Sequence, residues 1–242
     1  MGVRGERRAE GTLMAARRLS AALAAGALAG ILVGGVGGRV AMFVLRLTSD
    51  PALRGRLTDD GFTIGIVSTS TLFLLGATTI LGAMGGLAYL LVRRWLPEPL
   101  RPWLFGTLTG LVGGAAILRP GGIDFTLLDP LALAVAMFIA IPALGGAVTS
   151  VLAERFLRDG SAFRRSRIAF APLVFLVPIA LIGGPIGLLA IGAVVLLVLM
   201  LAATDLARPL SSTPVTWLGR AGLVAVGTLA FVGLAKDVSA IL

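Results

Sequence analysis

Arginine and aspartate side chains near two apolar segments are the residues of this chain best suited to chemistry. Arg39 lies at the end of the glycine-rich run "GALAGILVGGVGGRV" (26–40), and Arg119 follows "GTLTGLVGGAAIL" (106–118). The loops that come next contain the similar stretches "DDGFT" (59–63) and "GGIDFT" (121–126), which include Asp60 and Asp124. A guanidinium group can hold phosphate, and a carboxylate can act as a base. We therefore expect these four side chains to form a polar cluster on one face of the protein.

Two interpretations of this cluster are open. Arg39 can extend along its helix to the membrane surface, which lowers the cost of a charge near the boundary, or it can be a buried cation paired with an aspartate. Charged loops are commonly solvated, and their mutual ion pairs contribute little. Arginines interleave with the aspartates of both loops and already neutralise them, so we expect no metal ion there.

Cysteine and histidine are absent from the sequence. Their absence excludes disulfides, Cys/His zinc sites, iron–sulfur clusters and thiolate nucleophiles. It also removes the most common general base and the usual haem ligand. We expect no cofactor, and an enzyme built from this chain would depend on Asp, Glu, Arg, Lys, Ser, Thr or Tyr.

The elements that carry these residues are apolar enough to need a lipid environment. Of the 242 residues 57% are hydrophobic and only 14% are charged, with a mean hydropathy of +0.99. Soluble domains are about one quarter charged. Several apolar runs exceed the roughly 18 residues that mark a transmembrane helix. The sequence therefore predicts an all-α, polytopic bundle of transmembrane helices.

The hydropathy pattern predicts about seven membrane spans. The fifth and sixth form one apolar stretch of about 36 residues, too long for one helix at 1.5 Å per residue in a core about 30 Å thick. Gly183-Gly184-Pro185 supplies a break between them. If that break is only a kink, the number falls to six. The predicted spans are 19–47, 66–92, 103–118, 130–153, 168–183, 185–204 and 216–235.

The basic residues predict the orientation of the chain. With seven spans and a cytoplasmic N-terminus, 15 of the 21 Lys and Arg residues fall on the inner side, and the C-terminus lies outside. Trp95, Trp103 and Trp217 then fall at inner helix ends, as an aromatic belt requires. The net charge of +9 follows from this asymmetry, so we expect no nucleic-acid partner. The arginine-rich, alanine-rich composition favours the plasma membrane of a bacterium.

Small residues recur every four positions in several apolar segments. In lipid, close backbone approach across small residues drives helices together. We expect glycine-zipper packing within one bundle, with a homo-oligomer interface as the alternative. The first two spans and the next two also look alike, which suggests a parallel repeat over 19–92 and 103–153. The helix-packing residues are Gly26, Gly30, Gly34 and Gly38, together with Gly106, Gly110 and Gly114.

The segment "ERFLRDGSAFRRSRIAF" (154–170) combines five arginines with three phenylalanines. Basic residues near an anionic leaflet each contribute about 1 kcal/mol of attraction. We expect this segment to contact anionic lipid, with a docking site for a protein partner as the alternative. Residues 1–16 are expected to be a disordered, basic cytoplasmic tail ahead of the membrane domain at 17–242. The arginines expected to contact lipid are Arg155, Arg158, Arg164, Arg165 and Arg167.

Two stretches carry a resemblance to a known group of proteins. "GGRVAMFVLRLTSDPALRGRLTDDGFTIG" (37–65) and "RPGGIDFTLLDPLALAVAMFIAIPALGGAV" (119–148) resemble segments of uncharacterised multi-spanning membrane proteins of actinobacteria. The resemblance covers roughly residues 26–155 and implies a membrane location but no activity. We expect a non-enzymatic membrane protein, either a small-solute permease or channel or an accessory subunit of a membrane complex. The alternative is an enzyme that acts on a lipid or lipid-linked phosphate at the outer face.

Overall fold

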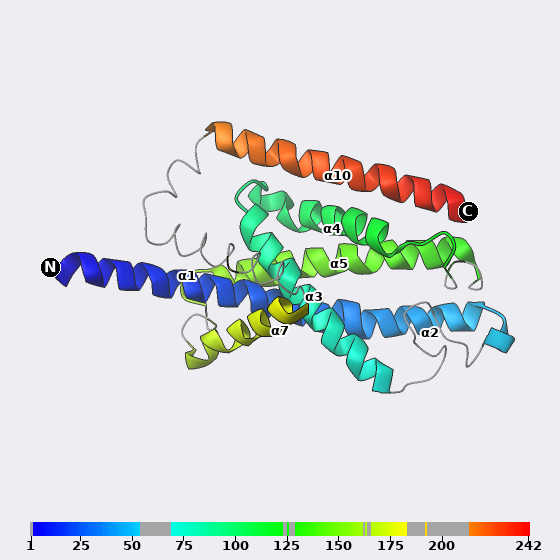
Figure 1. Ribbon diagram of the computed structural model, residues 1–242, viewed down its shortest axis with the longest axis horizontal. Coiled ribbons are helices and arrows are strands. Elements are labelled where there is room, and N and C mark those ends of the chain that lie inside the picture. Colours follow the sequence, from blue (N-terminus) through cyan, green and yellow to red (C-terminus); the bar gives the residue numbers. More distant parts are fainter. Residues whose placement is uncertain are drawn as a thin grey trace.

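The computed structural model of the chain describes residues 2–53, 69–122, 125, 129–161, 163, 166–182, 192 and 213–242. These residues form helices and no strands, as the sequence predicts (Figure 1). The elements are α1 (Gly2–Ala29), η1 (Gly30–Gly37), α2 (Gly38–Thr48), η2 (Pro51–Leu53), α3 (Thr69–Val92), η3 (Glu98–Leu100), α4 (Arg101–Ile117), α5 (Leu131–Leu157), η5 (Arg167–Phe175), α7 (Leu176–Ile182) and α10 (Thr213–Ile241).

Four helices in the described part of the chain are long and apolar enough to cross a membrane. They coincide with the predicted first, second, fourth and seventh spans. The predicted third span forms α4, which has 17 residues, and the fifth forms the shorter apolar helix Ala169–Leu181. The sixth span and the break at 183–185 lie outside the described residues. The four candidate spans are Glu10–Thr48, Thr71–Val92, Leu131–Leu157 and Thr213–Ile241.

The N-terminal helix is continuous from α1 through η1 to α2. Residues 2–16, which the sequence assigns to a tail ahead of the membrane domain, belong to α1. Arg, Glu, Ala, Leu and Met, which fill much of this stretch, all favour helix. Eight residues in the middle, Gly30–Gly37, form a π-helix, which has the wider i→i+5 hydrogen-bonding pattern.

Proline residues mark where two of the other helices begin. Pro102 lies in the first turn of α4, and Pro130 directly precedes α5. Proline is favoured at these positions because the first amides of a helix have no partner within it. α4 and α5 then run antiparallel and pack along each other (Figure 1).

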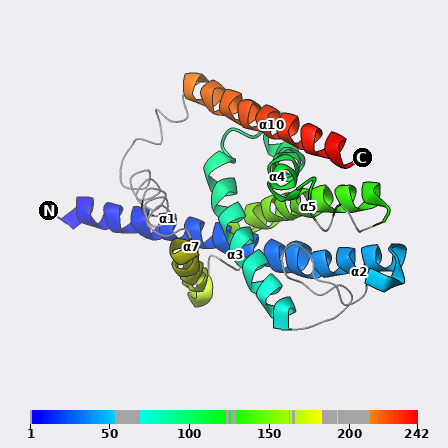
Figure 2. The ribbon, with the colours of Figure 1, turned by 45° about the vertical axis from the view of Figure 1, so that its right-hand side comes forward.

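α1 lies against α3, α5 and η5. α4 lies between α5 and α10, as the rotated view in Figure 2 shows. Ser20 of α1 donates a hydrogen bond to the carbonyl of Ala169 in η5, which links η5 to the N-terminal helix. The outer surface of α10 is almost entirely exposed and apolar, and includes Leu229 and Phe231.

The N-terminal helix and α3 cross with their backbones in close contact. Gly26 of α1 and Gly30 of η1 lie directly on Gly82 of α3, and the carbonyl of Thr78 faces Gly30. A methyl group built on Gly82 would lie 2.7 Å from the Cα of Gly30 and would overlap the carbonyl oxygen of Gly26. The two backbones therefore touch with no space for a side chain between them.

The remaining glycines expected to pack behave in different ways. Gly34 faces the side chain of Thr78, whereas a methyl group on Gly38 would meet nothing within 4 Å. α3 has already turned away from the N-terminal helix at that point (Figure 1). In α4, Gly106 and Gly110 lie against Ala143 of α5, and Gly114 lies against Ile139 and Leu234. The repeat that relates 19–92 to 103–153 stays a prediction.

Replacement of Gly82 by alanine tests the α1–α3 contact. We expect Gly82→Ala to destabilise the protein by about 2 kcal/mol, because overpacking a closed interface forces the backbones apart. The midpoint of thermal unfolding in detergent should fall by about 4–8 °C.

Gly85→Ala is the matched control, since it makes the same change three residues further along α3. A methyl group there meets nothing within 4 Å. Alanine favours helix over glycine by up to about 1 kcal/mol, so this variant should melt at the wild-type temperature or higher. Equal melting temperatures for both variants would contradict the close contact.

Candidate functional site

The predicted polar cluster of arginines and aspartates is only partly described. Arg39 lies on α2 and is half-buried, with its Nε and Nη2 atoms shielded from solvent. Arg119 is exposed just beyond the end of α4. Asp60 and Asp124 lie outside the described residues. The cluster therefore stays a prediction.

The basic segment expected to contact lipid is described in part as well. Arg155 and Arg158 are exposed at the C-terminal end of α5. Arg167 begins η5, but its side chain lies outside the described part, as do Arg164 and Arg165. The described half of this segment adjoins a polar site at the ends of α3 and α5.

That site is an ion-pair network around Glu154, near the end of α5. Arg93 donates two parallel hydrogen bonds to the carboxylate, from Nε to Oε1 at 3.0 Å and from Nη2 to Oε2 at 2.9 Å. Tyr89 donates from its hydroxyl to Oε1 at 2.6 Å, and Nη1 of Arg101 lies 3.3 Å from the same oxygen. Arg101 also pairs with Glu98 at 3.3 Å. We call these five residues the Glu154 cluster.

The helices that carry these side chains end or begin close to Glu154. Tyr89 is fully buried one turn before the end of α3, and Arg93 follows directly after that helix. Arg101 is the first residue of α4, where its Nε donates to the carbonyl of Leu96 at 3.3 Å. Phe105, one turn further along, packs edge-on against the Tyr89 ring at 5.0 Å. The cluster thus joins α3, α4 and α5 at one point.

The electrostatics of the cluster favour charged groups in a half-buried setting. Burial by itself lowers the pKa of the Arg93 guanidinium, but the hydrogen bonds and the charge of Glu154 outweigh it. The pKa of Arg93 is therefore held above its ordinary value. Bidentate arginine–carboxylate pairs are among the stronger ion pairs and fix geometry as well as charge. Both Glu154 oxygens accept hydrogen bonds, so this carboxylate is engaged in structure and is poorly placed to remove a proton.

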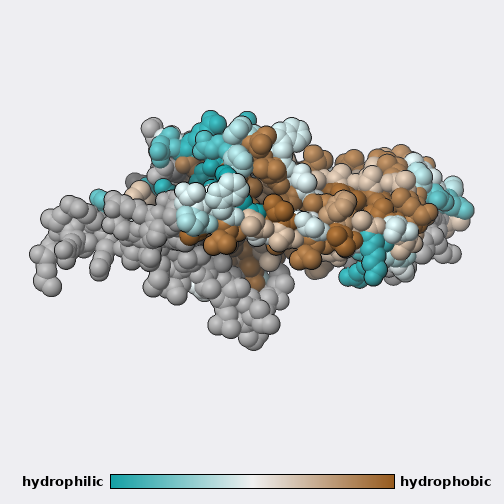
Figure 3. Space-filling view, turned by 90° about the horizontal axis from the view of Figure 1, so that it is seen from above, coloured by the Kyte–Doolittle hydropathy of each residue, from teal (hydrophilic) through white to brown (hydrophobic). Residues whose placement is uncertain are grey.

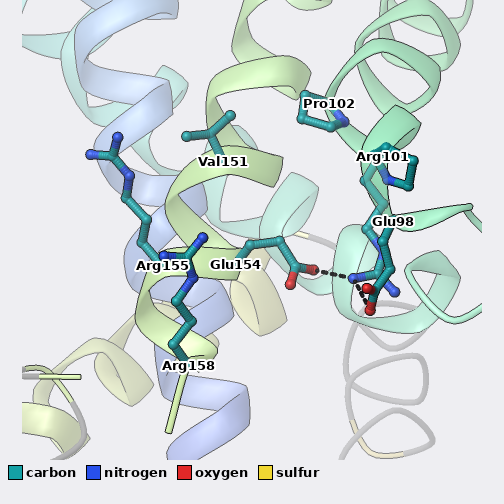
Figure 4. A pocket seen from close by; sticks show the side chains of 8 residues that line it. Glu98, Arg101, Pro102, Val151, Glu154, Arg155 and Arg158 are labelled. Carbon is teal, nitrogen blue, oxygen red and sulfur yellow. Dashed lines mark ion pairs between the residues drawn. The ribbon is translucent and has the colours of Figure 1, made fainter. Parts of the chain in front are cut away.

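A pocket of about 460 Å³ opens beside the cluster. Figure 4 shows Arg155 and Arg158 on one side of it and Arg101 with Glu98 on the other, with Glu154 between them. Such a volume lies within the range of small-ligand sites. The pocket is lined by Glu98, Pro99, Arg101, Pro102, Val151, Glu154, Arg155 and Arg158.

Tryptophans surround this end of the bundle. Arg220 of α10 donates from Nε to the carbonyl of Trp95 at 3.1 Å, and its guanidinium lies 5.7 Å from the Trp217 ring. Trp103 exposes 76% of its surface. Hydrophobic side chains dominate the middle of the face in Figure 3, and hydrophilic ones gather toward its ends. Exposed tryptophans between apolar and charged surfaces are typical of the membrane–water interface.

Sequence reasoning missed the Glu154 cluster. It assigned the arginines of this region to a basic surface and gave no role to Tyr89 or Glu154. Two signals were available: Tyr89 is the single tyrosine of the chain, and Glu154 is an acid at the end of an apolar helix among basic residues. Neither identifies a partner, because the residues that meet are separated by 61 and 65 positions in sequence.

Comparison of this chain with protein-family models, with curated proteins and with solved structures finds no match. The resemblance to actinobacterial membrane proteins therefore stays a prediction.

Neutralising Glu154 tests the contribution of the cluster. Its side chain is 27% exposed, and Glu154→Gln removes the charge that holds Tyr89, Arg93 and Arg101 together. Hydrogen bonds to charged groups contribute about 1.5–3 kcal/mol each, so we expect a loss of at least about 2 kcal/mol. The thermal midpoint in detergent should fall by about 4–8 °C.

Glu98→Gln is the control, because it removes the same charge from the same cluster at a side chain that is 83% exposed. Exposed pairs contribute about 0–1 kcal/mol, so its melting temperature should stay close to wild type. A larger loss in Glu98→Gln than in Glu154→Gln would show that Glu154 does not hold the cluster together.

Proposed function

We propose that the protein is a non-enzymatic integral membrane protein of several helical spans that acts as an accessory subunit of a membrane complex. The observation that carries this proposal is the α1–α3 crossing, where backbone lies on backbone at Gly26, Gly30 and Gly82. Such a contact makes a closed joint, which favours a supporting role for these helices over a solute path between them. We infer that these contacts, with those of Gly106 and Gly110, are glycine-zipper packing.

The charge distribution supports an orientation with the N-terminus in the cytoplasm and the C-terminus outside. The C-terminal ends of α3 and α5 lie beside the N-terminal ends of α4 and α10. The Glu154 cluster and Arg220 therefore share one end of the bundle. That arginine-rich end would face the cytoplasm under the positive-inside rule. The exposed apolar faces of α3 and α10 would then face lipid or a partner in a bacterial plasma membrane.

One other function has specific support, and the enzyme expected from the sequence is the remaining alternative. A small-solute permease or channel is favoured by Arg39, whose half-buried guanidinium lies well inside the first candidate span. An enzyme acting on lipid-linked phosphate would use Arg39 and Arg119 to hold phosphate, with Asp60 or Asp124 as base. Loss of activity in Asp124→Asn with normal folding would favour that enzyme.

Single cysteines test the topology and the closed joint, because the native chain contains none. We expect Ala52→Cys to react with a membrane-impermeant maleimide on intact cells and Asp159→Cys to react only after permeabilisation. Both residues are exposed, beyond the ends of α2 and α5. The reverse pattern would overturn the orientation.

Thr78→Cys places a thiol of similar size at the crossing, against Gly30 and Gly34. We expect no labelling in native membranes and full labelling after denaturation in detergent, which controls for the reactivity of the thiol. Labelling of the native protein would mean that water enters between α1 and α3, and the permease would become the better proposal.

An accessory subunit must have a partner. We expect the tagged protein, extracted in mild detergent, to migrate with a second membrane protein at fixed stoichiometry. A particle that contains only this chain, as a monomer or homo-oligomer, would contradict the accessory role.

A further inference from the structure

We propose that the pocket beside the Glu154 cluster binds the phosphate group of an anionic ligand through Arg155 and Arg158. The first argument for this proposal is the set of charges that line the pocket. Its two acids are engaged by neighbouring arginines, since Glu154 is held by Arg93 and Arg101, and Glu98 pairs with Arg101. Within the described part of the chain, Arg155 and Arg158 pair with neither acid. Two cationic side chains thus line a pocket whose carboxylates are already neutralised.

The geometry of the two arginines suits a phosphate. Arg155 lies in the last turn of α5, and Arg158 is the residue that follows the helix, so both line the pocket from its C-terminal end. Figure 4 shows them side by side on one wall of the pocket. Arginine presents several donors in a planar fork that matches the oxygens of phosphate. The C-terminal end of a helix also carries partial negative charge, which favours cations at this position.

The remaining lining indicates what the phosphate is attached to. Pro99, Pro102 and Val151 give the pocket an apolar wall beside its charged one. An amphiphile fits such a wall better than a free ion does. The exposed rings of Trp103 and Trp217 place the same end at the depth of lipid headgroups, if the protein spans the membrane as proposed. A phospholipid headgroup is therefore the favoured source of the phosphate, and a phosphorylated solute is the other source.

The test uses the full-length protein and a charge-matched pair of double variants. The protein is reconstituted in phosphatidylcholine bilayers with and without phosphatidylglycerol and then extracted in mild detergent. Native mass spectrometry counts the phosphatidylglycerol that remains bound. We expect Arg155→Gln/Arg158→Gln to retain at least about tenfold less than wild type, because two basic contacts are lost.

Arg18→Gln/Arg94→Gln is the control. It removes two exposed arginines that belong to the same arginine-rich end of the bundle but do not line the pocket. We expect it to retain phosphatidylglycerol within about twofold of wild type, since the general attraction of the surface decays over a Debye length of about 8 Å and holds no single lipid. Equal losses in both double variants would overturn the proposal, and so would no loss in Arg155→Gln/Arg158→Gln unless soluble phosphates stabilise wild type and not that variant.

A second measurement separates the two sources of phosphate. Inorganic phosphate and glycerol 3-phosphate are added to the detergent-solubilised protein, and the thermal midpoint is recorded. Stabilisation of wild type but not of the pocket variant, with equal lipid retention in both, would support the phosphate site with a water-soluble ligand. The labelling of Ala52→Cys and Asp159→Cys reports membrane orientation independently, so failure of the pocket and failure of the proposed function are distinguishable.

Discussion

The contact of α1 with α3 is the constraint on which the rest of the bundle depends. In a bilayer, apolar surface gains little by leaving lipid for another helix, so attraction must come from close packing and from polar contacts. Glycine at positions 26, 30 and 82 lets the two backbones touch and gives many atom pairs at short range. The same glycines lower helix propensity. Their use in apolar helices is explained by this contact, which larger residues would prevent.

The Glu154 cluster complements that contact at the arginine-rich end. Glycine contacts are smooth and leave a helix free to rotate by small amounts. The paired hydrogen bonds from Arg93 and the bond from Tyr89 fix α3 against α5 in one register. Arg101 brings the first turn of α4 to the same carboxylate. Apolar contact holds the helices together, and one half-buried carboxylate sets how their ends align.

The sequence was sufficient for properties that depend on composition and local pattern. It predicted helices throughout and an apolar character that four described helices share. The spacing of Gly26 and Gly30 marked the face that meets α3. It also included Gly38, where an added methyl group would meet nothing within 4 Å, because crossing helices touch over only a few turns. The Glu154 cluster and its pocket could not be predicted, since they depend on which helix ends meet in space. The predicted seven-span count depends in part on residues outside those described.

The crossing also determines how α3 can move. A joint of backbone on backbone has few side-chain rotamers to rearrange, so it resists translation more than rotation. One arm of α3, beyond Gly82, is tied down by Tyr89 and Arg93. The other arm runs 13 residues back to Thr69, about 20 Å, and carries exposed Leu72 and Phe73. A turn of about 10° at the joint would carry the tip of that arm through about 3 Å. Rotation of α3 about the joint would therefore displace its Thr69 end further than it displaces Tyr89, which lies nearer to Gly82 along the helix.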